Sequence, residues 1–316
     1  MGKLAYNNDQ DKNPPAGPTV RHWLATTDFS TASLHALDRA ARLAAELGGH
    51  CTVSHVIDPG GFEWLDGLLG AKKLGTIDVI EQECRESLTR LACVHADQYG
   101  IPIATRLDIG APAAMVASAA EEIAATLVTI GSHGESVIER ILMGSTTIRL
   151  LRKSRTPVLV VKRAPREPYQ RVLVPVDFSV ASIPSIRLAK EVAPGARMIL
   201  LHVFDLPYEG KLRYAGVDHA VILQHIIDAR KRLLDQLHKL ARSAGLGSND
   251  FVAQVVHGGA VREIRVAEQA NECDLIVLGK HGKNLAEKLL LGSVTSSMLA
   301  QSDADVLVIM DKDGKA

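Results

Sequence analysis

The sequence predicts an α/β protein that contains two tandem copies of one domain, each with a parallel sheet flanked by helices. A glycine-spaced pattern, Gly-x2-Gly-x9-Gly-Ser, occupies residues 131–145 and returns at residues 279–293. The tripeptide Asp-Phe-Ser at 28–30 returns at 177–179, at nearly the same offset, which indicates duplication of a whole domain. Short Val/Ile/Leu-rich runs alternate with amphipathic stretches, and this alternation is typical of a parallel sheet covered on both faces.

In the first copy, apolar runs predict the strands and the segments between them predict helices. The second helix has the clearest pattern, because apolar side chains recur at steps of three and four residues from Ile77 to His95. The fourth strand runs directly into the glycine pattern, and a helix follows that pattern. Strands are expected at 20–26, 50–57, 101–107, 126–131 and 157–162, and helices at 31–47, 76–99, 112–124 and 144–153.

The second copy repeats this order. Its second helix again has a helical period, with apolar positions from Val221 to Leu240. Strands are expected at 171–176, 197–203, 251–256, 274–279 and 305–310, and helices at 180–193, 217–244, 260–271 and 292–301.

The segments outside this repeat predict the domain boundaries. Residues 1–18 are polar and rich in Asn, Asp, Gly and Pro, so we expect a disordered tail. The first domain is then 19–164, a linker that contains two prolines beside charged residues occupies 165–170, and the second domain is 171–312. The glycine-containing segments 59–74 and 205–216 are expected as loops over the carboxyl edge of each sheet.

Composition narrows the class of protein. Lys plus Arg and Asp plus Glu both number 36, so no overall field favours nucleic acid or an anionic membrane. No apolar run approaches the roughly 20 residues that cross a bilayer. The four cysteines have no CxxC spacing, and the histidines form no ligand cluster, so we expect free thiols, no metal site and a cytoplasmic protein.

Three features together resemble the universal stress protein family over nearly all of the chain after the tail. They are the glycine pattern, the strand-end Asp-Phe-Ser and the final strand Pro-Val-Leu-Val-Val. The resemblance implies two Rossmann-like domains of the adenine nucleotide alpha hydrolase type, each with a five-stranded parallel sheet of order 3-2-1-4-5. It also implies the ATP-binding class of the family, because the glycine pattern is intact in both halves.

Site residues follow from the resemblance position by position. The strand-end aspartate contacts the nucleoside, a valine lines the adenine slot, and the glycines and serine hold phosphates. The implied nucleotide-binding residues are Thr26, Asp28, Val56, Gly131, Gly134, Gly144, Ser145 and Thr146 in the first half, and Pro175, Asp177, Val203, Gly279, Gly282, Gly292, Ser293 and Val294 in the second.

The residues themselves support the same location. Ligands of open parallel sheets bind beyond the carboxyl ends of the strands, where the strand order reverses. Glycine admits a phosphate close to the backbone, and Ser145 and Ser293 could cap the helices that follow. The alternative for Asp28 and Asp177 is a purely structural helix cap.

The two sites are not expected to be equivalent. Lys280 and Lys283 in the second pattern correspond to Ser132 and Glu135 in the first. Because lysine attracts a triphosphate and glutamate repels it, we expect the second half to bind ATP, with or without Mg²⁺, more tightly.

An ATP-binding regulatory module is the favoured function, without a dedicated catalytic residue. A slow ATPase or autophosphorylating phosphotransferase stays open, with His133 or His281 as the acid and Ser145, Ser293, Thr147 or Thr295 as acceptors. A scaffold with a structural nucleotide is a further alternative. The final strands are apolar sheet edges, so the halves are expected to pair as an intramolecular pseudo-dimer, with a further homodimer possible and the protein partner unknown.

Overall fold

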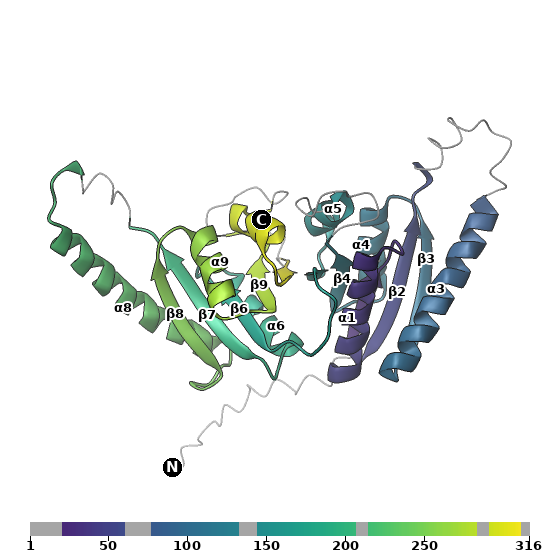
Figure 1. Ribbon diagram of the computed structural model, residues 1–316, viewed down its shortest axis with the longest axis horizontal. Coiled ribbons are helices and arrows are strands. Elements are labelled where there is room, and N and C mark those ends of the chain that lie inside the picture. The colour runs from purple at the N-terminus through teal and green to yellow at the C-terminus, as the bar shows by residue number, and fades with distance from the viewer. Residues whose placement is uncertain (1–20, 61–76, 133–143, 207–213, 283–290, 311–316) are drawn as a thin grey trace, which may run out of the picture.

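Ten strands form a single sheet in the computed structural model, in which the described residues are 21–60, 77–132, 144–206, 214–282 and 291–310. The strand order is β3-β2-β1-β4-β5-β10-β9-β6-β7-β8 (Figure 1). Each half therefore has the predicted order 3-2-1-4-5, and all pairings within a half are parallel.

The element boundaries lie close to those predicted. In the first half the structure has β1 (His22–Thr26), α1 (Thr31–Leu47), β2 (His50–Ile57), α3 (Ile77–Tyr99), β3 (Ile103–Ile109), α4 (Pro112–Glu122), β4 (Leu127–Gly131), α5 (Ser145–Lys153) and β5 (Val158–Val161). In the second it has β6 (Arg171–Pro175), α6 (Ser182–Val192), β7 (Arg197–Phe204), α8 (His219–Ser243), β8 (Phe251–His257), α9 (Ala260–Ala270), β9 (Leu275–Gly279), α10 (Ser293–Gln301) and β10 (Asp305–Ile309).

The burial of α8 differs from the prediction at one position, and three predicted segments lie wholly or mostly outside the described residues. Of the apolar positions predicted for α8, Ile222 and Leu237 are buried, whereas Val221 is 48% exposed. The N-terminal tail at 1–18, and most of the loop segments 59–74 and 205–216, lie outside the described residues.

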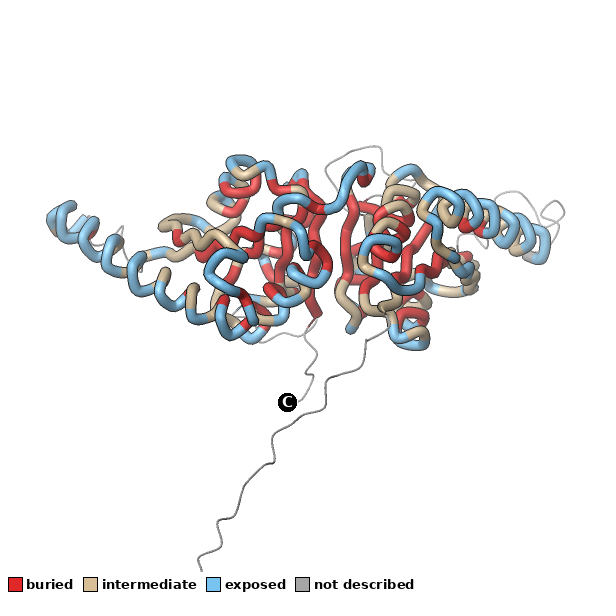
Figure 2. The backbone as a smooth tube through the Cα atoms, turned by 90° about the horizontal axis from the view of Figure 1, so that it is seen from below, coloured by how far each residue is buried: buried red, intermediate tan, exposed pale blue. Residues whose placement is uncertain are grey.

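Helices cover both faces of the sheet and bury a separate apolar layer on each. Residues of one strand alternate between the layers: Trp23 and Ala25 belong to one, and Leu24 to the other. The first layer packs under α1, α3, α6 and α8, and the second under α4, α5, α9 and α10. Buried residues consequently run through the middle of both halves (Figure 2).

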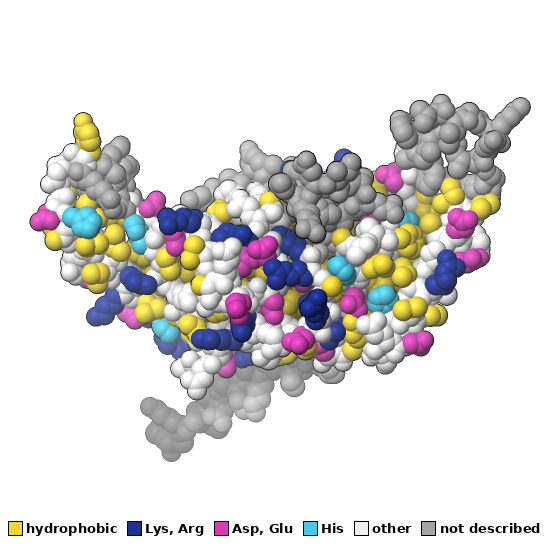
Figure 3. All heavy atoms as spheres, in the orientation of Figure 1, with side chains coloured by type: hydrophobic (Ala, Val, Ile, Leu, Met, Phe, Trp, Pro, Cys, Tyr) yellow, Lys and Arg dark blue, Asp and Glu magenta, His cyan; other side chains and the backbone are white. Residues whose placement is uncertain are grey.

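The surface carries charges of both signs. On the face seen in Figure 3, basic and acidic side chains are interspersed. No helix of the described residues combines the length and the apolar character that crossing a bilayer requires.

The two halves meet where β5 pairs antiparallel with β10. The register places Leu159 opposite Leu307, and every residue of both strands is buried. Because both apolar layers contain residues from the two halves, the core is continuous across this seam.

A buried carboxylate reinforces the seam. Asp305, at the start of β10, accepts hydrogen bonds from the Lys162 backbone N–H at 2.8 Å and from the Tyr169 hydroxyl at 2.7 Å. The Arg39 guanidinium lies 3.6 Å from its Oδ2 and stacks 3.9 Å from the centroid of the Tyr169 ring. Burial raises the pKa of Asp305, while Arg39 opposes that shift. The predicted linker is therefore held in the core at Tyr169, which is 4% exposed.

Two lysines also cross the seam in opposite directions. Lys162, after β5, donates from Nζ to the carbonyl of Ser302 at 2.6 Å, at the end of α10. Lys280, after β9, donates from Nζ to the carbonyl of Arg152 at 2.8 Å, in the last turn of α5. Each cation thus lies at the negative end of a helix in the other half.

Replacing Asp305 should weaken the fold strongly. Asp305→Ala leaves Arg39 buried without its carboxylate, and breaking such a pair costs about 3–5 kcal/mol in the free energy of unfolding. Urea denaturation measures this loss. Asp303→Ala is the matched control: its side chain is 62% exposed, so the change should stay within about 0.5 kcal/mol. Equal losses in the two variants would contradict the assignment of this role to Asp305.

Lys162 should make stability depend on pH. Burial lowers the pKa of its amine to about 8 from 10.5, against the opposing effect of Glu268 and Asp305. Between those values the unfolded chain binds more protons, so the free energy of unfolding rises with pH, by up to about 3 kcal/mol. Denaturation from pH 7 to 10 should show wild type gaining stability relative to Lys162→Met. A constant difference between them would contradict the lowered pKa.

Candidate functional site

A crevice opens in the second half because β6 and β9 separate at their carboxyl ends. These strands pair only at Val172–Leu275 and Leu173–Ile276, whereas β6 stays paired with β7 through Pro175. The helices that follow β6 and β9, α6 and α10, lie on opposite faces of the sheet, so this is the point at which the strand order reverses.

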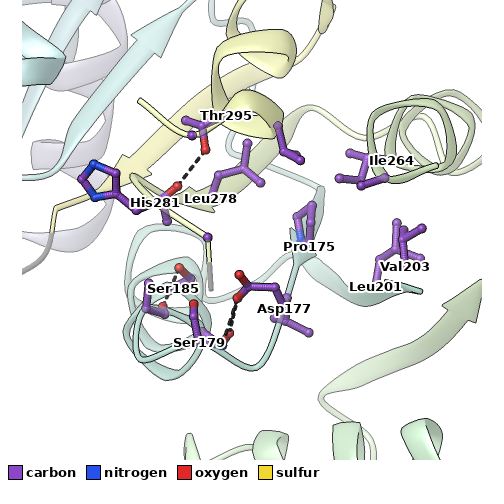
Figure 4. A pocket seen from close by; sticks show the side chains of 18 of the residues that line it. Pro175, Asp177, Ser179, Ser185, Leu201, Val203, Ile264, Leu278, His281 and Thr295 are labelled. Atoms are coloured by element: carbon purple, nitrogen blue, oxygen red, sulfur yellow. Dashed lines mark hydrogen bonds between the residues drawn. The ribbon is translucent and has the colours of Figure 1, made fainter. Parts of the chain in front are cut away.

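A cavity of about 240 Å³ occupies this crevice. Its apolar side is formed by β7, β9 and α9 through Leu201, Val203, Leu278 and Ile264 (Figure 4). All eight residues predicted for the second half line it: Pro175, Asp177, Val203, Gly279, Gly282, Gly292, Ser293 and Val294.

Asp177 brings a carboxylate to the polar side of the cavity. Its Oδ1 accepts hydrogen bonds from the Ser179 backbone N–H at 2.9 Å and from the Ser182 hydroxyl at 3.3 Å. Its Oδ2 lies 3.1 Å from the point that a Cβ on Gly282 would occupy. The carboxylate and the glycine pattern are therefore direct neighbours, although 105 residues separate them in the chain. Asp177 is not a helix cap, because the N-cap of α6 is Ala181.

The first glycine of each pattern is required by packing. A Cβ on Gly279 would lie 2.7 Å from the Cβ of Ala181, and one on Gly131 would lie 2.8 Å from the backbone of Ala32. Both glycines let the end of a strand pack against the segment that begins the first helix of its half. The first glycine of each pattern therefore has a packing role whether or not a phosphate binds beside it.

The positive end of α10 faces the cavity. Gly292 is the N-cap and Ser293 the first helical residue, so the expectation that the serine caps the helix is wrong; Gly144 and Ser145 repeat this arrangement at α5. The backbone N–H groups of such a first turn have no acceptor within the helix. The hydroxyl of Thr295 donates to the Gly279 carbonyl at 2.8 Å, which engages it inside the protein.

The first half differs at the strand end. Thr26 stands where the second half has Pro175, and its buried hydroxyl donates to the Thr129 carbonyl at 3.2 Å. This bond ties β1 to β4, which stay paired through Ala25 and Thr129. Proline has no N–H or hydroxyl for such a tie, and the second crevice opens one residue pair earlier.

The other predicted residues of the first half occupy equivalent places. Asp28 is exposed in the turn after β1, Val56 is half-buried in β2, and Gly131 ends β4. Gly144 and Thr146 flank Ser145 at the start of α5. Gly134 lies outside the described residues, as do His133, Glu135 and Lys283.

The expectation that Lys280 attracts phosphate is not supported by its position. Its side chain is 7% exposed and reaches across the seam to the Arg152 carbonyl. The sequence shows that a lysine occupies this glycine-rich loop, but it does not show toward which part of the protein the lysine side chain points.

Comparison with known proteins identifies the family. The model of the universal stress protein family matches this chain twice, over residues 19–162 and 168–310. The chain belongs to the universal stress protein family. A universal stress protein of Mycolicibacterium smegmatis is 26% identical over 302 residues, which cover 90% of this chain and 96% of the relative. One from Methanocaldococcus jannaschii is 32% identical over 141 residues, covering 45% of this chain and 81% of the relative.

A solved structure shows that the tandem fold is shared. A universal stress protein from Archaeoglobus fulgidus superposes with a TM-score of 0.61 at 21% identity, covering 92% of this chain and 98% of its own.

Two further observations concern the His, Cys, Asp and Glu side chains of the described residues. No group of three or more His, Cys, Asp or Glu side chains in those ranges could hold a metal ion. Burial raises the pKa of both Cys51 and Cys273 to about 12, so these thiols stay protonated at neutral pH.

Some residues of the cavity were not predicted. Ile264 and Ala260 of α9 and Leu278 of β9 belong to its wall. The helical period of α9 places Ile264 on an inner face, but periodicity cannot distinguish a core position from the wall of a crevice.

Adding one methyl group at Gly131 should destabilise this universal stress protein. The Cβ of Gly131→Ala would collide with backbone atoms of Ala32 and Ser33 at 2.8–2.9 Å, and overpacking of this kind costs about 1–3 kcal/mol. Gly195→Ala is the control, because a Cβ there has no heavy atom within 4 Å. Urea midpoints compare the variants; similar midpoints would show that β4 does not need glycine for packing.

Proposed function

We propose that the second half of this universal stress protein binds an adenine nucleotide, with ATP as the favoured ligand. The observation that carries the proposal is the cavity at the switch point of the sheet, lined by every residue predicted for that half. Its volume, about 240 Å³, is just below the range of roughly 300–1,000 Å³ typical of small-molecule sites.

The chemistry of the lining fits the three parts of the ligand. The apolar wall of Leu201, Val203 and Ile264 suits a flat base. The Asp177 carboxylate can accept hydrogen bonds from ribose hydroxyls. The first turn of α10 offers backbone N–H donors and a positive helix end to phosphate, beside Gly282 and Gly292.

The preference for the second half rests on the strand ends. Pro175 leaves the crevice between β6 and β9 open, whereas the Thr26 hydroxyl ties β1 to β4. The strand ends therefore favour tighter binding in the second half, for a reason that does not depend on the charge of Lys280.

We further propose a regulatory or binding role in the stress response, in which the halves act as an intramolecular pseudo-dimer. The antiparallel pairing of β5 with β10 supports that arrangement. The domain division at 19–164 and 171–312 belongs to the same proposal, since the connecting segment passes along the seam at Tyr169.

Slow hydrolysis or autophosphorylation is the second candidate, because His281 and Ser293 both line the cavity. Ser145 and Ser293 are exposed, whereas Thr147 and Thr295 are buried and donate to glycine carbonyls. The serines are therefore the better acceptors.

Titration calorimetry with ATP and Mg²⁺ tests the proposed site. Gly282→Glu places a second carboxylate beside Asp177 and should weaken ATP binding about tenfold or more through repulsion of phosphate. Gly195→Glu, on the turn between α6 and β7, should bind like wild type. Gly134→Glu, the equivalent change in the first half, should weaken binding less.

Three results would contradict the proposal. Absence of ATP binding by wild type would refute nucleotide binding, and a larger loss from Gly134→Glu would refute the preference for the second half. Rapid phosphate release that His281→Ala abolishes would favour the enzymatic candidate over the binding module.

A further inference from the structure

A strained turn carries Asp177 into the cavity. Phe178, the next residue, has φ = 60°, in the left-handed region that bulky side chains rarely adopt. The hydrogen bond from the Ser179 N–H to the Asp177 carboxylate closes the turn across this residue. Such a conformation persists only where the surroundings hold it in place.

His202 of β7 provides that support at two points. Its Nδ1 donates to the Val176 carbonyl at 2.8 Å, immediately before Asp177. Its ring packs on Phe178, with the centroids 4.4 Å apart. The Val176 N–H donates to the Leu201 carbonyl at 2.8 Å, so both backbone groups of Val176 are fixed to β7 and the imidazole replaces the next rung of the ladder.

The first half repeats every part of this arrangement. Phe29 has φ = 65°, and its ring lies 4.5 Å from that of His55. His55 Nδ1 lies 2.8 Å from the carbonyl of Thr27, the residue before Asp28. A coincidence of packing would not reproduce a strained backbone, a ring contact and a hydrogen bond at both duplicated positions.

We propose that His202 is a positioning residue for the nucleotide: it fixes the left-handed turn at Phe178 and thereby aims the Asp177 carboxylate into the cavity. The inference rests on the proposed function, because Asp177 is the group through which His202 acts. An imidazole suits this task because its Nδ1–H donates to a carbonyl while its flat face supports an aromatic ring. His202 itself does not line the cavity, so the proposed effect on binding is indirect.

A double-mutant cycle with ATP and Mg²⁺ tests this coupling. His202→Phe keeps a ring against Phe178 but removes the donor, and should weaken ATP binding about tenfold. In the Asp177→Ala background the same change should alter the dissociation constant less than about twofold, since its target is gone. His202→Asn places an amide N–H where Nδ1 stood and should recover most of the affinity.

His257→Phe is the matched control. His257 also packs on a phenylalanine, Phe204, with the centroids 5.3 Å apart, but Phe204 does not adjoin Asp177 in the chain as Phe178 does. It should leave ATP binding unchanged. Thermal unfolding verifies that each variant is folded. Phe178→Ala carries the test if His202→Phe does not fold, because alanine keeps the strain of a left-handed residue but removes the ring contact, and it should also lose about tenfold in affinity only while Asp177 is present.

The outcomes separate the two proposals. If wild type does not bind ATP, the proposed function fails. If wild type binds and Asp177→Ala weakens binding, but folded His202→Phe binds normally, the positioning role is overturned and the site stands. A full tenfold loss from His202→Phe in the Asp177→Ala background would also overturn it, as would equal losses in the Phe and Asn variants.

Discussion

Strands β5 and β10 impose the constraint on which the arrangement of both halves depends. Each is the last strand of its half and is buried on both faces, so each would otherwise present an apolar edge with unpaired backbone groups. Antiparallel pairing satisfies both edges and joins the two apolar layers. It also buries Asp305, whose charge then requires Arg39, Tyr169 and the backbone of Lys162 as partners.

The same strand order also determines where the candidate site lies. In each half it lies between the first and fourth strands, and the fourth strand separates it from the β5–β10 seam. The first and fourth strands of each half are paired only over part of their length and then separate. In the second half this brings Asp177 beside Gly282 and the first turn of α10. Gly279 is needed so that the end of β9 can pack against the start of α6, and its backbone also lines the cavity.

The elements could be predicted because their signals are local. Helix α1 and strand β2 begin and end where expected, and the repeat placed the second-half residues at one cavity. The sequence could not predict where the Lys280 side chain points or that Asp305 is buried, since each depends on a partner more than 100 residues away in the chain. The left-handed Phe178 could not be predicted either, because Phe gives no signal for positive φ.

The position of Pro175 has a consequence for how a duplicated chain can diverge. The crevice opens between β6 and β9, whereas the two halves are joined through the pairing of β5 with β10. An exchange between threonine and proline at the end of a central strand therefore alters one copy without loosening its attachment to the other. Point substitutions at these strand ends can therefore make the crevices of the two copies differ, while the β5–β10 seam that joins the copies is unchanged.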